Sequence, residues 1–350
     1  MLGAIIGDIV GSRFEFRNNK SKDFEFFHEK CFFTDDSVMA LAIAEAIIEA
    51  ENNFEDLSNR TICCMKEIGR NYPNCGYGGM FRRWMYSEMT EPYNSYGNGA
   101  AMRVSVCGFV GQTLDEVKEL SRKVTEITHN HPEGLKGAEA TSVAIYLART
   151  GSTIKEIEEY IDKNYYPMNF TLDEIRPKYA FKESCQETVP QAIKAFLEST
   201  SFEDAIRNEI SIGGDSDTIG AITGGIAEAY YGIPEEMKVI AKTYLDGRLK
   251  KICEDFERVY PNENEIKNEY QKDEFILGQI IDNLRWTNPD VINKVRNQRN
   301  EAELSEEEYN LLKIKHQKIS EDYNEQLEYM KKRYGDLNEA GKKYGMFARR

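Results

Sequence analysis

Two short stretches of the chain each place two aspartates and hydroxyl side chains where a helical pattern begins. Thr34-Asp35-Asp36-Ser37 leads into one apolar helical run, and Asp215-Ser216-Asp217-Thr218 leads into another, directly after Gly213 and Gly214. Residues two apart on a helix point to nearly opposite sides, so Asp215 and Asp217 can converge only in an irregular turn, which paired glycines permit. Taken alone, each stretch also fits a helix cap, because Asp, Ser and Thr accept hydrogen bonds from first-turn amides.

Together, the two stretches contain more carboxylates than two caps need. If both face one cavity, repulsion between the four like charges requires a cation among them. The ligand atoms are all oxygen, with no Cys or paired His nearby. Such a set suits the hard ions Mg²⁺, Mn²⁺ or Ca²⁺. Four carboxylates fit a pair of divalent ions, which in proteins lie about 3.5 to 4 Å apart and assist displacement reactions.

Two glycine-rich loops could bind an anion. Gly76-Tyr77-Gly78-Gly79 is followed later by Ser95-Tyr96-Gly97-Asn98-Gly99, which leads into a short helix. Unpaired backbone amides in such loops bind phosphate groups. Tyr96 could stack on a nucleobase or serve only in packing, and ordinary turns have the same glycine pattern.

Two further side chains are candidates for polar roles. His129 and His131 form a His-x-His pair, which is a poor zinc signature without another soft ligand. We expect His129 to hydrogen-bond a substrate, with a structural role as the alternative. Glu15 lies in a loop among aromatic residues, and from its surroundings in the sequence alone it is an ordinary solvated charge.

The composition of the chain limits the kinds of partner that it can bind. The 350-residue chain has a formal net charge of -15, which disfavours unspecific binding to nucleic acid or to an anionic membrane. Its seven cysteines are odd in number and contain no Cys-x-x-Cys pair, which is typical of reduced thiols in a cytosolic protein. We find no basic leader and no apolar run of membrane-spanning length, so we expect a cytoplasmic protein.

Helical spacing recurs from Ser37 to about Val259 while period-two alternation is scarce, so we predict an all-α fold. The segment from Met1 to Phe16 is predicted to be a short apolar helix broken by Gly7 and Gly11, followed by a loop. Composition shifts near Pro261 towards Glu, Lys, Asn and Tyr. We therefore expect one domain over 1–260 and a charged helical extension over 261–350.

The extension is predicted to contain two or more amphipathic helices, the longer from about Ser305 to Arg333. It shows no sustained heptad pattern, so a coiled coil is not predicted. A solvated appendage that packs on the main domain and a module for partner binding or self-association both stay open.

Five separated motifs, in order, resemble those of the ADP-ribosylglycohydrolase family, which includes dinitrogenase reductase-activating glycohydrolase and the ADP-ribosylarginine and ADP-ribosylserine hydrolases. The resemblance covers roughly residues 1 to 259. The motifs are Gly3-x-x-x-Gly7-Asp8-x-x-Gly11 with Glu15, Thr34-Asp35-Asp36-Ser37, Gly97-Asn98-Gly99-Ala100-Ala101-Met102-Arg103, Thr128-His129 and Gly213-Gly214-Asp215-Ser216-Asp217-Thr218. Ser37 stands where the family often has threonine, a conservative difference.

This resemblance implies an orthogonal bundle of α-helices with a dinuclear Mg²⁺ or Mn²⁺ centre. It implies a mobile carboxylate, Glu15, at that centre, and a substrate-contacting histidine, His129. The implied metal ligands are Thr34, Asp35, Asp36, Asp215, Asp217 and Thr218, together with Glu15. The implied loops for the diphosphate and adenosine contain Gly78, Gly79, Ser95, Tyr96, Gly97, Asn98 and Gly99.

The implied reaction is hydrolysis of the bond between C1'' of ADP-ribose and an acceptor, with an ADP-ribosylated arginine of a protein as the first choice. Glu15 is the first candidate for general base or metal gate, and Asp35 and Asp36 are the fallback. Amides of the glycine loops would hold the diphosphate without any basic side chain. The alternatives are an ADP-ribose reader that does not hydrolyse, a hydrolase of a serine, nucleic-acid or small-molecule conjugate, and a structural role.

Overall fold

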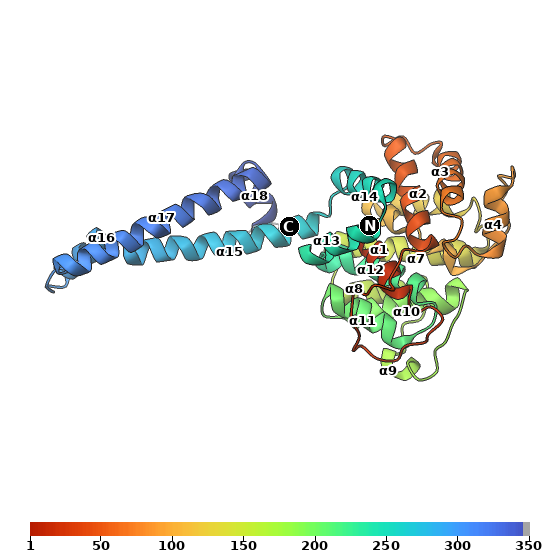
Figure 1. Cartoon of the computed structure of the whole chain (residues 1–350), viewed down its shortest axis with the longest axis horizontal. Helices are drawn as coiled ribbons and strands as arrows, with labels where there is room; N and C mark the ends of the chain where they lie inside the picture. The colour runs from red at the N-terminus through yellow and green to blue at the C-terminus, as the bar shows by residue number, and fades with distance from the viewer. Residues whose placement is uncertain (346–350) are drawn as a thin grey trace. The chain divides into compact units, whose positions relative to one another are not determined.

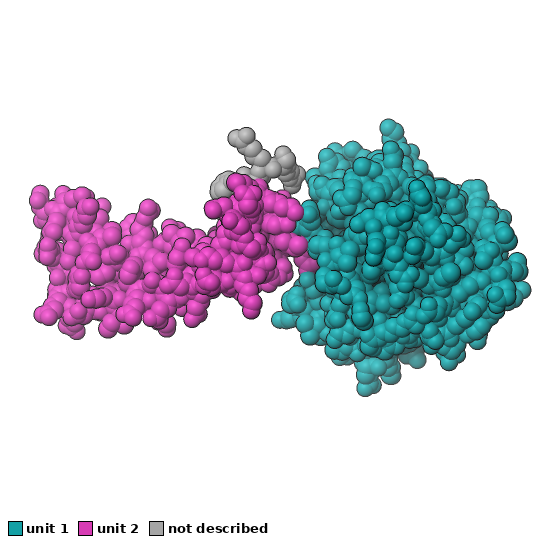
Figure 2. Space-filling view, turned by 90° about the horizontal axis from the view of Figure 1, so that it is seen from above, with its two compact units in different colours: residues 1–264 teal, residues 265–350 magenta. Residues whose placement is uncertain are grey.

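The computed structural model describes residues 1–345, which form eighteen α-helices, one short 3₁₀ helix and no β-strand (Figure 1). The predicted all-α fold is confirmed. The chain divides into two compact units, one over 1–264 and the other from residue 265 onward (Figure 2). This division lies close to the composition shift near Pro261. No helix within the described residues is both long and apolar enough to cross a membrane.

Two buried helices at the centre of the first unit, α1 (Leu2–Gly11) and α12 (Ser216–Tyr231), pack directly against each other. A Cβ atom on Gly7 would lie only 1.8 Å from the carbonyl oxygen of Gly220, so the two backbones are in close contact. The helix ends at Gly11, as expected, but the expected break at Gly7 is wrong. The missing side chains allow close helix packing instead, in the pairs Gly3 with Gly224, Gly7 with Gly220 and Gly11 with Ser216.

The helix α2 (Asp35–Glu49) begins beside this pair. Its N-cap is Thr34, whose hydroxyl oxygen accepts a hydrogen bond from the amide of Asp36 at 3.3 Å. Its apolar residues are buried from Val38 to Ile47, against α1, α3 (Leu57–Asn71) and α14 (Gly247–Val259). Burial of this helix fixes where its acidic N-terminus lies.

The other helices of the first unit enclose this centre. Those that pack on α12 include α7 (Pro132–Arg149), α10 (Cys185–Leu197) and α11 (Phe202–Ile212). The rest are α4 (Gly79–Tyr86), α5 (Ser105–Val110), α6 (Leu114–Thr125), α8 (Ile154–Asn164), α9 (Leu172–Ile175) and α13 (Glu235–Tyr244), with the 3₁₀ helix η1 at Asn98–Ala100.

In the second unit, α15 (Glu263–Thr287) and α17 (Glu306–Tyr334) lie side by side, joined by α16 (Pro289–Gln298) and followed by α18 (Leu337–Tyr344) (Figure 1). Its described core consists of Tyr270, Met330 and Ala340. Along α17 the less exposed side chains recur every three or four residues from Tyr309 to Met330. Polar residues such as His316 occupy part of this seam, which explains why the sequence showed no heptad.

Candidate metal and substrate site

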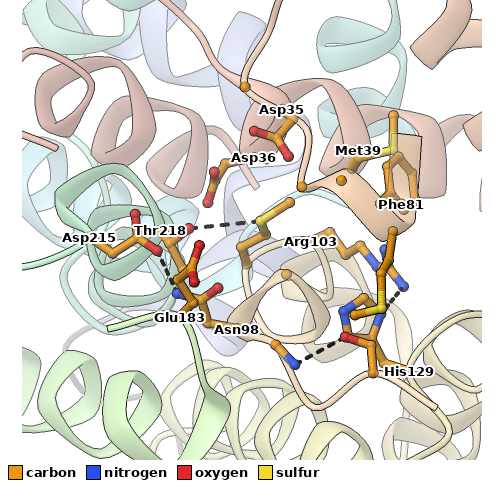
Figure 3. Close-up of a pocket in the computed structure, with 18 of the residues that line it drawn as sticks. Asp35, Asp36, Met39, Phe81, Asn98, Arg103, His129, Glu183, Asp215 and Thr218 are labelled. Atoms are coloured by element: carbon orange, nitrogen blue, oxygen red, sulfur yellow. Dashed lines mark hydrogen bonds between the residues drawn. The ribbon is translucent and has the colours of Figure 1, made fainter. Parts of the chain in front are cut away.

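The acidic starts of α2 and α12 meet at one cavity. Asp35 and Asp36 lie across from Asp215 and Thr218 (Figure 3). The cavity has a volume of about 450 Å³, and Glu15 and Asp217 also line it. The turn before α12 depends on Gly213 and Gly214, whose φ angles of 67° and 98° are ones that other residues rarely adopt.

Two groups of three carboxylates converge closely enough to hold metal ions. One oxygen from each of Asp8, Asp36 and Asp217 lies within 4.8 Å of the others, and Glu15, Asp215 and Asp217 form a second such group. Asp217 belongs to both groups. Two adjacent cation sites that share a carboxylate are therefore compatible with this arrangement.

The electrostatics of the cavity also favour a cation. Burial, followed by the charges of neighbouring carboxylates, raises the pKa of Asp35, Asp36 and Asp217 well above the usual range. Within residues 1–345, none of these three forms an ion pair with a lysine or arginine. Asp36 Oδ1 is buried and has no hydrogen-bond partner. A divalent cation would supply the missing partner and the missing positive charge.

Asp8 is a residue of this site that the sequence analysis quoted but did not assign a role. Its oxygens accept hydrogen bonds from the amide and hydroxyl of Thr34, at 2.9 and 2.7 Å, and from the amide and hydroxyl of Ser37. Four donors occupy the accepting positions of one carboxylate. Asp8 therefore anchors the start of α2, and it could serve a metal ion beside Asp36 and Asp217 only if it gave up some of these bonds. A single acidic residue within an apolar run was the signal available in the sequence.

Glu15 faces the aspartates, so it is not the solvated charge that its place in the sequence suggested. It is half-buried, and burial together with the charges of Asp217 and Asp8 raises the pKa of Glu15 to about 8. The ring of Phe16 stacks on Phe181 at 5.9 Å between centroids. Farther along this loop, Asn18 accepts a hydrogen bond from the amide of Gly214 at 2.8 Å. The loop is thus tied to the turn before α12.

The two threonines of the predicted ligand set differ in their surroundings. Thr218 lines the cavity, and its hydroxyl lies 3.9 Å from the sulfur of Met102 (Figure 3). Thr34 is buried outside the cavity lining, and its hydroxyl is bonded to Asp8. Thr34 could reach a metal ion only if it left Asp8.

The glycine loops line the other side of the cavity. Gly78 and Gly79, at the start of α4, have open space where a side chain would be. Ser95, Gly97 and Gly99 also line the cavity. The unpaired amides at a helix start favour an anion there.

Asn98 joins the second glycine loop to the acidic side. Its amide nitrogen donates to Asp215 Oδ2 at 2.6 Å, and it also lies 3.3 Å from the hydroxyl of Thr188. This hydrogen bond lowers the pKa of Asp215, but burial dominates and raises it to about 6. Asn98 lines the cavity, so a contact with substrate and this tethering role are compatible.

Tyr96 is the predicted substrate residue that lies outside the lining. Its ring packs against His131 at 5.2 Å between centroids, and half of the side chain is exposed. His131 in turn caps α7 by accepting a hydrogen bond from the amide of Glu133 at 3.1 Å. The structure therefore gives His131 a capping role.

His129 does line the cavity, next to buried Arg103 (Figure 3). Arg83 lines the cavity as well. The expectation that no basic side chain takes part in holding an anion is therefore not supported by the geometry. The lining also includes residues that the sequence analysis did not name, such as Met39, Met80, Phe81, Tyr93, Phe181 and Glu183, and Met102, which it quoted only within a motif.

A sequence model of the ADP-ribosylglycohydrolase family matches residues 1–265. The chain belongs to the ADP-ribosylglycohydrolase family. The match covers all of the first unit, including both acidic helix starts and both glycine loops.

Curated members of this hydrolase family are distant relatives. ADP-ribosylhydrolase ARH3 of Xenopus tropicalis is 28% identical, over 70% of this chain and 91% of that protein. The human ADP-ribosylhydrolase ARH3 is 24% identical, over 70% of this chain and 88% of the human protein. The ADP-ribosyl-(dinitrogen reductase) glycohydrolase of Rhodospirillum rubrum is 24% identical, over 67% of this chain and 85% of the bacterial one.

A solved structure described as an ADP-ribosylglycohydrolase-related protein complex has the same fold. It superposes with a TM-score of 0.54 at 21% identity, over 73% of this chain and 96% of that one. The predicted family and its helical bundle are therefore confirmed.

Proposed function

We propose that this chain hydrolyses the glycosidic bond between ADP-ribose and a modified protein side chain, with arginine as the preferred acceptor. The observation that carries the proposal is a single cavity with buried carboxylates on one side and, on the other, glycine amides, Arg83 and His129, with Arg103 next to His129. The first side suits divalent cations and the ribose hydroxyls. The second suits the diphosphate and the adenosine.

Two Mg²⁺ or Mn²⁺ ions would be held by Asp36, Asp215 and Asp217, with Glu15, Asp35 and Thr218 at the edge of the same group. When bound, such ions orient the ribose hydroxyls and lower the pKa of a water molecule. The acidic residues of the chain itself also stabilise the positive charge that develops on the sugar in an oxocarbenium-like transition state.

Glu15 is our candidate for the general base. It lines the cavity, it lies in reach of the oxygens of Asp215 and Asp217, and its loop is held at both sides by Phe181 and Gly214. Divalent cations beside Glu15 would favour its ionised form, and that carboxylate could accept the proton of an attacking water. Asp35 and Asp36 are the fallback, because both line the same cavity.

Arginine is our first choice of acceptor because of charge. Glu15 and the exposed side chain of Glu183 both line the cavity, and the whole chain has a formal net charge of -15. A guanidinium group is attracted to such a surface, whereas a serine hydroxyl gains nothing from it.

The test uses the full-length protein with Mn²⁺ or Mg²⁺ and two peptides, one ADP-ribosylated on arginine and one on serine. We expect release of free ADP-ribose, measured by mass spectrometry, with arginine faster than serine. Asp217→Asn should abolish release, while Asp173→Asn, at an exposed aspartate of α9, should not change it. Binding of ADP-ribose without release from either peptide, with metal bound, would identify a reader instead.

A further inference from the structure

Arg103 is a buried cation in the cavity wall. Its side chain is 1% exposed, and within residues 1–345 it forms no ion pair. One of its terminal nitrogens, Nη2, donates to the hydroxyl oxygen of Thr128 and lies 3.4 Å from Nδ1 of His129. Burial lowers the pKa of Arg103 only to about 10, so the guanidinium is charged at neutral pH.

These contacts determine which imidazole nitrogen of His129 carries the proton. The Thr128 hydroxyl lies 2.8 Å from Nδ1, and Arg103 Nη2 approaches the same atom. A guanidinium can only donate hydrogen bonds, and the Thr128 hydroxyl, which already accepts one from Arg103, still has its own proton to donate. A proton on Nδ1 would face the donor Arg103 and leave the hydroxyl proton without this partner, whereas Nδ1 as an acceptor suits both neighbours. Nδ1 is therefore the acceptor, and Nε2 carries the single proton of the neutral ring.

The protonated nitrogen faces the second glycine loop. Nε2 lies 3.7 Å from the position that a Cβ atom of Gly97 would take and 3.6 Å from the corresponding position at Gly99. Both glycines line the cavity. A side chain at either position would stand close to Nε2, so the glycines leave room for a ligand atom to reach this donor.

We propose that Arg103 is a positioning residue, which holds His129 as a neutral imidazole whose Nε2–H is aimed at a hydrogen-bond acceptor of a ligand on the Gly97–Gly99 loop. The identity of that ligand as ADP-ribose rests on the proposed function, whereas the orientation and tautomer of His129 do not.

Within residues 1–345, three other titratable side chains contact His129 or act on Arg103. Tyr93 packs on the imidazole at 5.9 Å between ring centroids, and burial raises the pKa of Tyr93 to about 12. Cys185 and Asp35 are the other titratable groups whose charges act on Arg103. Burial raises the pKa of Cys185 to about 12, so this thiol is neutral at physiological pH. Arg103 is thus the charged neighbour of His129.

The experiment is long-range proton–nitrogen NMR of the full-length protein with ¹⁵N-labelled histidine rings. The chain has four histidines, and His129→Gln assigns the signals of the one in question. We expect the wild-type His129 to have its proton on Nε2 and to stay neutral under mildly acidic conditions. Burial and, to a lesser extent, the charge of Arg103 lower the pKa of His129. In Arg103→Met we therefore expect both tautomers and a pKa that is higher than in the wild type but still below the usual value, because the burial remains.

Affinity for free ADP-ribose, measured by calorimetry, supplies the second readout. We expect Arg103→Met to weaken binding about tenfold, which corresponds to about 1.4 kcal/mol, and Arg103→Lys to restore part of the loss. Arg149→Met is the matched control, because Arg149 is a partly buried arginine that donates to the carbonyl oxygens of Gly108 and Gly111. The control should leave the His129 signals unchanged.

A proton on Nδ1 in the wild type would overturn the inference, and so would an unchanged tautomer and titration of His129 in Arg103→Met. If that variant does not fold, the wild-type spectrum and Thr128→Val decide, since the valine removes the hydroxyl and leaves Arg103 to hold Nδ1 as an acceptor. Failure of the wild-type protein to bind ADP-ribose would count against the proposed function and would leave the NMR result as it is.

Discussion

Asp8 shows how one buried carboxylate can organise a neighbouring helix start. It accepts hydrogen bonds from the amides and hydroxyls of Thr34 and Ser37, and the next two positions of that turn, Asp35 and Asp36, line the cavity. Asp8 therefore determines the position of two acidic residues without lining the cavity itself.

Replacement of Asp8 by asparagine should destabilise the protein and weaken metal binding. An amide has only one oxygen to accept with, so some of the four donors lose their partner. We expect the free energy of unfolding to fall by about 1 to 3 kcal/mol for each buried donor left unpaired. Urea denaturation measures this, and Asp173→Asn, at an exposed aspartate of α9, is the control. Unchanged stability would show that Asp8 does not anchor α2.

The carboxylates also predict how stability depends on pH in the absence of metal. Burial raises the pKa of Asp215 to about 6 and that of Glu15 to about 8, and it raises the pKa of Asp36 and Asp217 well above the usual range. A raised pKa means that the folded chain holds protons that the unfolded chain has released. Stability is therefore lost as the pH rises through these folded-state values.

In EDTA, the free energy of unfolding should fall between about pH 6.5 and pH 8.5. Below this window the depressed pKa of His129 acts in the opposite direction, because the unfolded chain gains protons there. Free Mn²⁺ at a hundred times its dissociation constant should raise the free energy of unfolding again, by about 2.7 kcal/mol. Greater stability at the higher pH in EDTA would contradict the carboxylate arrangement described here.

At the scale of elements, the contact between α1 and α12 sets the distance between Asp8 and Asp217. Gly7 lies against Gly220 so closely that an added Cβ atom would overlap its carbonyl group. Gly7→Ala should therefore push the helices apart, at about 1 to 3 kcal/mol, and should weaken Mn²⁺ binding measured by calorimetry. Gly278→Ala is the control, because nothing lies within 4 Å of that position. Wild-type metal affinity in Gly7→Ala would show that the spacing is not critical.

The acidic helix starts could be predicted from the sequence, but the residues that position them could not. Two Asp-rich starts that exceed the needs of capping point to a shared cation, and the structure brings these starts to one cavity. Asp8 and Arg103 are single charged residues in short motifs, and only the folded chain shows what they contact. In a sequence, a glycine that ends a helix cannot be told from one that lets two helices pack closely. For this reason the break predicted at Gly7 is not found.

Side-chain direction was the other feature that the sequence did not determine. Tyr96 sits between residues that line the cavity, yet its ring packs on His131. A loop has no fixed period, so neighbours along it can face opposite ways. In α17 the seam could be recognised only from burial, because His316 and tyrosines share it with aliphatic residues.

At the scale of the whole molecule, the family match ends where the second unit begins. The first unit has its own extensive core and every residue of the candidate site, while the described core of the second unit consists of Tyr270, Met330 and Ala340. A shortened chain of residues 1–264 should therefore fold and release ADP-ribose at the rate of the full chain. Thermal unfolding and the peptide assay measure this, and loss of folding would show that the first unit depends on the second.

The self-association or partner binding expected for residues 261–350 stays a prediction. Trp286, Leu311 and Ile314 are large apolar side chains that are 69% or more exposed in the second unit. Analytical ultracentrifugation of the full chain and of residues 1–264 would compare their association states directly.

The central claim is that the starts of α2 and α12 together hold divalent cations. Anomalous diffraction from crystals of the full-length protein grown with Mn²⁺ tests it most directly. The account predicts two anomalous peaks between Asp36 and the pair Asp215 and Asp217, separated by about 3.5 to 4 Å. No manganese peak between these carboxylates, in crystals with excess Mn²⁺, would contradict it.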